Sequence, residues 1–200
     1  MICNLKFRRG LSKGVAMLAL GLGLLTRAAM GAPQPGASAS SAFWGALQHD
    51  EVDRVQTLLL RGVDTNVVHP ELGPAIVVAA RDKSWKTVRL LARLSGTLVD
   101  APNRRGETPL MFAAFHGQLD VARLLVQKGA EINRTGWTPL HYAATNGHAD
   151  LVRYLLDENA YIDAQSPNHT TPLMMAARHG HPEVVRLLVK AGADPTARNE

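Results

Sequence analysis

Apolar residues recur along the chain at helical spacing, in short stretches separated by glycine-containing turns. Val121, Leu124 and Leu125 lie three and four positions apart, and similar spacing returns in 151–156 and 184–188. Residues at i, i+3 and i+4 share one face of an α-helix, so each stretch predicts an amphipathic helix with one buried side. A shorter apolar stretch precedes each of them across a turn and predicts a partner helix.

These helix pairs are copies of one repeating unit. Residues 106–114, 136–144 and 171–177 each contain Thr-Pro-Leu followed by an Ala-Ala pair, and their prolines are 30 and 33 residues apart. Two less regular copies, which lack the Thr-Pro-Leu start, precede them. A period near 33 residues indicates stacked repeats, because one such unit cannot bury its own apolar face.

Residues 138–144, Thr-Pro-Leu-His-Tyr-Ala-Ala, resemble the hallmark of the ankyrin repeat, Thr-Pro-Leu-His-x-Ala-Ala. The resemblance extends over 42–200. It implies an all-α solenoid of about five helix-turn-helix units with short β-hairpin-like finger loops. We place the units at about 42–68, 69–102, 103–133, 134–165 and 166–200.

Each regular unit carries residues that start and stop its helices. A threonine is expected to cap the first helix through its hydroxyl, at 108, 138 and 171. The proline after it suits the first helical turn, where no amide donor is needed. A glycine then allows the left-handed backbone that ends this helix, at 117, 147 and 180.

Two departures from the repeat predict surface features. The link 132–136 is three residues shorter than its counterpart before unit five, which predicts a clipped finger and a notch between units three and four. No polar capping repeat follows unit five. We therefore expect its outer face, with Met174 and Met175, to be exposed or covered, and self-association is one way to cover it.

The first 32 residues have the features of a cleaved signal peptide. Basic residues up to Lys13 precede an apolar stretch over 15–25 and then small residues, which is the order of an export signal. We expect a periplasmic or secreted protein, exported by the Sec route or, given Arg8-Arg9, the twin-arginine route, with a flexible linker over 33–41. An uncleaved membrane anchor and a mitochondrial transit peptide are the alternatives, and no stable membrane insertion is expected once the signal is removed.

The charge distribution argues against a nucleic-acid partner. The chain has 22 Lys and Arg against 17 Asp and Glu, but five of the basic residues lie in the leader. From residue 33 onward basic and acidic residues are equal in number. A neutral body lacks the basic surface that nucleic acids require.

The sequence contains no motif for catalysis or cofactor binding. It has no Gly-rich phosphate loop, no Gly-x-Ser-x-Gly and no His-Glu-x-x-His, and its single cysteine, Cys3, lies in the leader. We predict neither enzyme activity nor a cofactor. A row of histidines near the turns between paired helices leaves a metal-binding or redox accessory role as the alternative. They are His49, His116, His148, His179 and His181.

The remaining prediction is recognition of an unidentified protein. In the ankyrin-repeat proteins that the chain resembles, finger tips and exposed positions of the first helices bind partners. The corresponding positions are Arg104, Arg105, Glu107, Phe115, His116, Arg134, Thr135, Trp137, Thr145, Asn146, Asn168, His169, Arg178 and His179. Trp137 and Arg105 are the strongest candidates, because Trp and Arg often carry binding energy at interfaces. Trp137 stacking on the neighbouring finger is the competing expectation.

An arginine recurs at one place of the second helix in four units, at 89, 123, 153 and 186. Asp120, Asp150 and Glu183 stand three residues before the last three of these arginines. Such spacing favours ion pairs within each helix, so we expect a paired, solvated surface rather than an anion-binding row.

Overall fold

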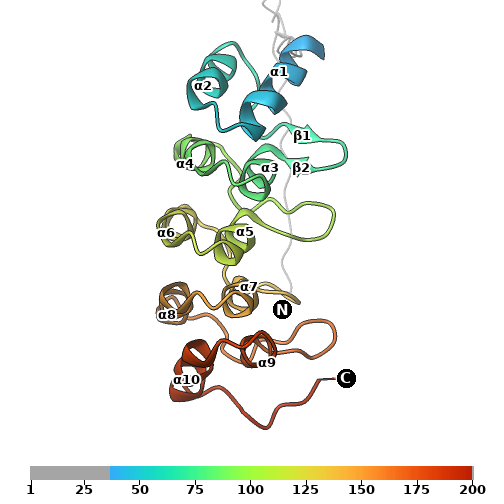
Figure 1. Ribbon diagram of the computed structural model, residues 1–200. Helices are drawn as coiled ribbons and strands as arrows, with labels where there is room; N and C mark the ends of the chain where they lie inside the picture. The colour runs from blue at the N-terminus through green and yellow to red at the C-terminus, as the bar shows by residue number, and fades with distance from the viewer. Residues whose placement is uncertain (1–36, 200) are drawn as a thin grey trace, which may run out of the picture. The chain divides into compact units, whose positions relative to one another are not determined.

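The computed structural model describes residues 37–199, which form ten helices and one small hairpin. In chain order they are α1 (Ala37–Gln48), α2 (Val52–Leu60), β1 (Val68–His69), β2 (Gly73–Pro74), α3 (Ala75–Arg81), α4 (Trp85–Arg93), α5 (Pro109–Phe115), α6 (Leu119–Gln127), α7 (Pro139–Thr145), α8 (Ala149–Asp157), α9 (Pro172–Arg178) and α10 (Pro182–Lys190). Consecutive helices pair across a short turn, and the five pairs stack on one another (Figure 1). The predicted all-α solenoid is confirmed.

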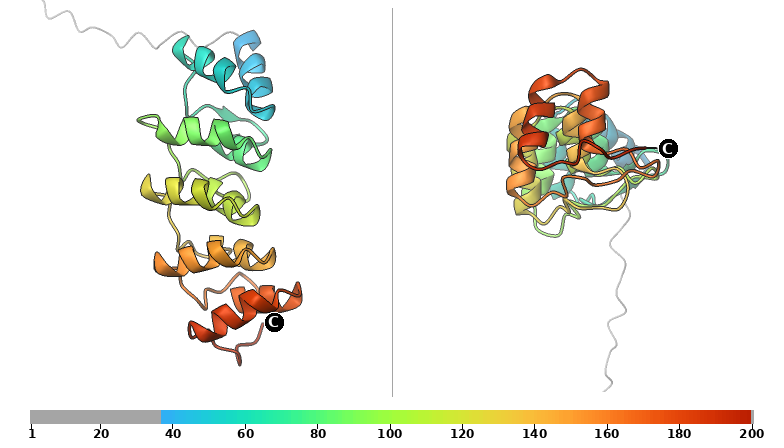
Figure 2. Two further views of the ribbon diagram at one scale, coloured as in Figure 1. Left: turned by 60° about the vertical axis from the view of Figure 1, so that its left-hand side comes forward. Right: turned by 90° about the horizontal axis from the view of Figure 1, so that it is seen from below.

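The helices form two columns within this stack. The odd-numbered helices make one column and the even-numbered helices the other, and the finger loops project from the side of the odd-numbered helices (Figure 1, Figure 2). The fingers and the first helices therefore share one face of the repeat array. Within residues 37–199, no helix has the length and apolar character needed to cross a membrane.

A continuous core fills the space between the columns and between the units. Leu125, Leu155 and Leu188 of the second helices have no exposed surface, and the Ala-Ala pairs of α5 and α7 are equally buried. These small side chains let neighbouring first helices approach closely. In α9 Ala176 is buried whereas Ala177 is exposed. The second alanine is thus covered only where another unit packs over it.

The first unit begins earlier than the sequence suggests. Residues 37–41, expected to be part of a flexible linker, lie in the first turns of α1, so that expectation is wrong for these five residues. The apolar end of α1 anchors the helix, since Phe43, Ala46 and Leu47 are fully buried, and helix-favouring alanines then extend it toward the N-terminus. The signal peptide expected over 1–32 and the rest of the linker lie outside the described residues.

The fingers differ in length and regularity. The finger between units one and two contains an antiparallel hairpin in which Val68 pairs with Pro74 and His69 with Gly73. The link from α6 to α7 is three residues shorter than the link from α8 to α9, and its loop is visibly short in Figure 1. The clipped finger between units three and four is confirmed.

The predicted helix caps form, with one variation. The hydroxyls of Thr108 and Thr171 accept hydrogen bonds from the backbone N–H groups of Met111 and Met174, at 3.3 and 3.4 Å. The Thr138 hydroxyl instead pairs with Nδ1 of His141 at 2.9 Å. Each cap satisfies polar groups that a helix start leaves without an intrahelical partner.

In units two, four and five, the residue before the second helix ties its unit to the one before. Nε2 of His148 lies 3.0 Å from the carbonyl oxygen of Phe115, and Nε2 of His181 lies 2.8 Å from that of Thr145. The Ser84 hydroxyl donates to the carbonyl of Gln48 at 3.1 Å in the same way. Each carbonyl belongs to the last residue of the preceding first helix, where the helix itself supplies no donor. We call these contacts the carbonyl bridges.

A second series of hydrogen bonds joins the units at the base of the fingers. Asn133 donates from Nδ2 to the carbonyl of Asn159 and accepts at Oδ1 from the N–H of Tyr161, both at 2.8 Å. Asn66 makes the same pair of bonds with Gly96 and Leu98. The carboxylates at 100 and 163 accept from the next unit's backbone as well. These contacts, the amide bridges, extend through all four interfaces between the five units.

Candidate functional site

Aromatic side chains form a row of ring contacts across units two to four, from the start of α4 to the finger before α7. The Phe115 ring lies 6.2 Å from that of Tyr142, which lies 6.5 Å from Trp137. On the other side Phe115 contacts His116, which contacts Trp85. We call these five residues the aromatic strip. Phe115 and Trp137 are 37% and 36% exposed and present apolar surface to solvent, whereas Trp85 and Tyr142 are half-buried and pack against the core.

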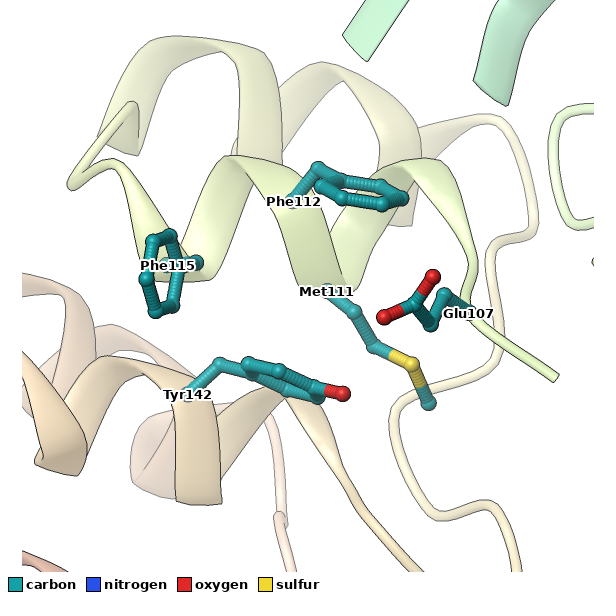
Figure 3. Close-up of a pocket in the computed structure, with 5 residues that line it drawn as sticks. All are labelled: Glu107, Met111, Phe112, Phe115 and Tyr142. Carbon is teal, nitrogen blue, oxygen red and sulfur yellow. The ribbon is translucent and has the colours of Figure 1, made fainter. Parts of the chain in front are cut away.

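A cavity of about 130 Å³ opens on this strip between α5 and α7. It is lined by Glu107, Met111, Phe112, Phe115 and Tyr142. Figure 3 shows the rings of Phe112 and Phe115 on the α5 side and that of Tyr142 on the α7 side, with the Glu107 carboxylate at one end. We call it the aromatic pocket. Two adjacent units contribute its walls, so it exists only when they are stacked.

The finger of unit three fixes the position of Glu107. Nδ2 of Asn103 donates to Oε2 of Glu107 at 2.7 Å, while Oδ1 of Asn103 accepts from the backbone N–H groups of Arg105 and Glu107. These bonds close a tight turn around Gly106, whose φ is +77°, a conformation that favours glycine. The carboxylate is therefore held beside the rings by the loop. Burial, and then the charge of Glu107, raises the pKa of Tyr142.

A second, polar hollow of about 350 Å³ lies beside the aromatic pocket. Its lining residues are Glu71, Leu72, Arg81, Asn103, Arg104, Arg105 and Glu107. Arg81 is paired with Asp82 at 2.8 Å. Arg104 and Arg105 are exposed and form no ion pair within residues 37–199. The finger of unit three thus carries two arginines, Arg104 and Arg105, that are available to a partner next to the aromatic pocket.

Several predicted binding residues serve the repeat itself. Arg134 pairs with Asp100 and Glu131. The Asn146 amide donates to the Phe115 carbonyl at 2.6 Å. Thr145 donates to the carbonyl of His141 at 2.7 Å. The polar groups of these side chains already form hydrogen bonds or ion pairs within or between units, so they are less available to a partner than those of Arg104 or Arg105.

The other predicted residues are distributed over three fingers and helix ends. Thr135 and Trp137 are exposed at the clipped finger, and the Trp137 ring packs on His141 of its own unit at 5.2 Å. Asn168 and His169 lie exposed on the last finger, where Asn168 accepts from the Ser166 hydroxyl and His169 contacts Gln165. Arg178 and His179 are exposed at the end of α9. The structure therefore brings together the candidates of units three and four and leaves those of unit five apart.

Sequence reasoning missed three walls of the aromatic pocket: Met111, Phe112 and Tyr142. A signal was present. Phe112 and Tyr142 occupy the same motif position, the residue before Ala-Ala, where unit five has Met175 and unit two has Val78. Two aromatic residues at one register in adjacent repeats lie one above the other in a stack. The same register argument also locates the pocket between units three and four.

The histidines of the predicted row make different contacts from one another. His148 and His181 form carbonyl bridges, and Nδ1 of His49 lies 2.8 Å from the carbonyl of Gly45 in its own helix. His116 packs between Trp85 and Phe115, and burial, followed by the positive charge of Lys83, lowers its pKa. Within the described part of the chain, no three His, Cys, Asp or Glu residues gather as a metal-binding group.

The arginine row pairs differently from the prediction. Arg153 forms the expected ion pair with Asp150, at 2.7 Å. Arg89 bonds to Asp120 of the next unit, with Nε at 2.9 Å, and Arg123 lies over the Tyr154 ring at 4.5 Å from its centroid. The expected pairing within one helix is therefore wrong for Arg123, because its guanidinium lies on the ring of the next second helix. It is also wrong for Arg186, because Glu183 pairs with Arg153 at 3.7 Å and Arg186 forms no ion pair within residues 37–199. Arg89, Arg123 and Arg153 thus each contact the next unit.

Comparison with known proteins agrees with this architecture. A family model described as ankyrin repeats (3 copies) matches residues 43–135 and again residues 132–199. Together the two matches span almost all of the described residues. A search of curated proteins found no match. On the strength of the family match and the five stacked helix pairs, the chain belongs to the ankyrin-repeat family.

Proposed function

We propose that this chain is a non-enzymatic protein-binding module that docks a folded partner on the finger and first-helix face of units three and four. Ankyrin repeats are generally protein–protein interaction modules. The observation that carries the proposal is the aromatic pocket, which opens on that face beside the free cations of the unit-three finger. A hollow flanked by exposed aromatic and arginine side chains has the composition of an interface centre.

The stack supports binding because it holds this surface rigid. Phe112 and Phe115 are carried by α5, and Tyr142 by α7, and both helices pack between neighbouring units. Side chains on a pre-formed scaffold lose little conformational freedom when a partner binds, so less binding energy is spent on ordering them. A small number of contacts then suffices for a specific complex.

The test is partner capture with variants of the proposed face. Immobilised chain carrying Phe115→Ala, or Trp137→Ala together with Arg105→Ala, should retain at least about tenfold less of the captured protein than wild type, corresponding to about 1.4 kcal/mol or more. Leu60→Ala is the matched control, because Leu60 is 83% exposed on α2, in the other column. Equal retention by all variants would refute the proposed face.

We further propose that the protein acts outside the cytoplasm, in the periplasm or as a secreted protein. The support is the order of basic, apolar and small residues over 1–32. Mass spectrometry of the N-terminus, on the protein recovered from each cell fraction, tests this. A chain that begins near residue 32 in the periplasm or medium is the expected result, and an intact Met1 in the membrane fraction contradicts it.

A further inference from the structure

We propose that the aromatic pocket receives a lysine side chain of the protein partner. This inference rests on the proposed function, since it names the group that the partner inserts. Three aromatic rings and one carboxylate surround a space the size of a side chain, and the pocket is open to solvent on the binding face. That combination suits an aliphatic stem that ends in a positive charge.

The rings supply the first part of the recognition. Phe112, Phe115 and Tyr142 come from two units, and the Phe115 and Tyr142 rings meet edge to face at 76°. The face of an aromatic ring carries negative potential and attracts a cation within about 6 Å of its centroid. This attraction grows when water is excluded, as it is when a side chain fills a hollow. An ammonium group among the rings therefore gains a cation–π attraction that an uncharged methyl group does not have.

Glu107 supplies the second part. Its carboxylate is held in place by Asn103, and it forms no ion pair with any Lys, Arg or His of residues 37–199. A purely apolar side chain in the pocket would remove water from this carboxylate without replacing its hydrogen bonds, which is unfavourable. An ammonium group would donate to it. The finger arginines line the polar hollow and no part of the aromatic pocket.

The size of the pocket separates a side chain from a small-molecule ligand. Its volume of about 130 Å³ is well below the roughly 300 to 1,000 Å³ of typical ligand pockets. Lysine has a flexible four-carbon stem and a compact charged end, so the stem contacts Met111 and the rings while the ammonium reaches Glu107. The planar guanidinium of arginine is bulkier at the tip.

The experiment compares two probes that differ in one charge. Chain with ¹³C-labelled Phe and Tyr rings is titrated with Nα-acetyl-lysine methylamide and with Nα-acetyl-norleucine methylamide, which has the same stem and no ammonium. The lysine probe should shift the Tyr142 and Phe115 ring signals at concentrations at least about tenfold lower than the norleucine probe. Glu107→Gln should remove most of that preference.

The control is Glu71→Gln, because Glu71 lines the polar hollow and not the aromatic pocket. This variant should keep the preference for lysine. Equal shifts by both probes, no shift by either, or an unchanged preference in Glu107→Gln would each overturn the inference. Urea unfolding of each variant verifies that it is folded.

Partner capture separates this inference from the proposed function. If Phe115→Ala loses the partner while Glu107→Gln retains it fully, the face binds protein but the pocket takes no lysine. If neither variant loses the partner, the proposed face is wrong. Loss in both, together with the probe preference, supports both conclusions.

Discussion

At the scale of single residues, His141 shows most clearly how one side chain can join two units. It is fully buried. Nδ1 lies 3.1 Å from the Thr138 backbone nitrogen and so accepts its hydrogen, which places the ring proton on Nε2. Nε2 then donates to the Thr170 carbonyl of the next unit at 2.9 Å. In the other regular units a methionine sulfur accepts from the threonine N–H and no second bond follows.

Replacing His141 by methionine isolates the bond between units four and five. The sulfur can still accept from the Thr138 N–H, as Met111 and Met174 do for their threonines, but the Thr170 carbonyl keeps only the hydrogen bond from the Ser166 N–H of its own unit, at 3.0 Å. We expect His141→Met to lower the free energy of unfolding by about 0.5 to 1.5 kcal/mol, the net contribution of one hydrogen bond. Urea titration followed by circular dichroism measures it, and an unchanged midpoint would show that the bond contributes nothing.

The same residue predicts a pH dependence. Burial lowers the pKa of His141 in the folded chain, so the folded state favours the neutral ring. The stability that this provides is present above the unfolded pKa of about 6.5 and is lost as the pH falls through the lower folded value. The free energy of unfolding should therefore fall from pH 7 to pH 5, and less steeply in His141→Met. Parallel curves for the two proteins would contradict the assignment; His116, whose pKa burial also lowers, accounts for residual slope.

At the scale of helices and turns, the carbonyl bridges explain why glycine is needed in two particular turns. An added Cβ at Gly147 would lie 2.5 Å from Nδ1 of His181, and one at Gly117 would lie 2.6 Å from Nδ1 of His148. At Gly180 the same Cβ would meet nothing within 4 Å, although all three residues have positive φ. The glycines of units three and four thus make room for the histidine of the next unit.

This difference provides a matched pair of variants. Gly180→Ala carries only the strain of a left-handed alanine, about 1 kcal/mol. Gly147→Ala carries that strain and also displaces His181 from the Thr145 carbonyl, which should add about 1 to 2 kcal/mol. Urea titrations of both variants measure the difference. If the two lose equal stability, the histidine bridge is not a significant contact.

The amide bridges make a second prediction about unit interfaces. Asn133→Ala removes two hydrogen bonds with unit four, and we expect it to cost about 1 to 3 kcal/mol. Gln127→Ala, at an exposed position of α6, is the comparison and should change stability by less than about 0.5 kcal/mol. Thermal unfolding of the two variants checks the ordering, and a larger loss for Gln127→Ala would reverse the interpretation.

At the scale of the described repeat array, each unit is stabilised by packing between its own two helices and by its neighbours in the stack. Units two to four are covered on both sides, whereas units one and five have one neighbour each in residues 37–199. In such an array the ends open more readily than the middle. Hydrogen exchange should therefore be at least about tenfold slower for the amides of α5 and α7 than for those of α10. Uniform protection would indicate a fold that opens as one unit.

The sequence predicts the repeats better than it predicts the contacts between them. The Thr-Pro-Leu motif and the apolar stripes identified the helix pairs, and a deletion in one link identified the clipped finger, because these features are local. The start of α1 was not predicted. The left-handed turns at Asp50 and Lys83 were not predictable either, since the residue that usually marks such a turn, glycine, is absent from both positions. The Asp50 side chain also joins units one and two, because its carboxylate accepts from the N–H groups of Lys86 and Thr87 at the start of α4.

The aromatic pocket was predictable from the sequence only in part. The register of Phe112 and Tyr142 was readable, but the place of Glu107 depends on the turn that Asn103 closes, which no pattern of apolar residues encodes. The partners of the arginine row were missed for a similar reason. Residues 31 positions apart compete with residues three positions apart, and only the stacked geometry decides between them.

The two series of bridges have a consequence for how such a chain can change over time. A bridging side chain at 66, 133, 148 or 181 bonds to a peptide N–H or C=O of the adjoining repeat, and the histidines at 148 and 181 also need the turn glycine of that repeat. Nearly every amino acid offers both groups. A copy that keeps its turn glycine can therefore be duplicated, excised or moved without other compensating substitutions in the adjoining repeat, and descendants with four or six copies would keep the same hydrogen bonds between units.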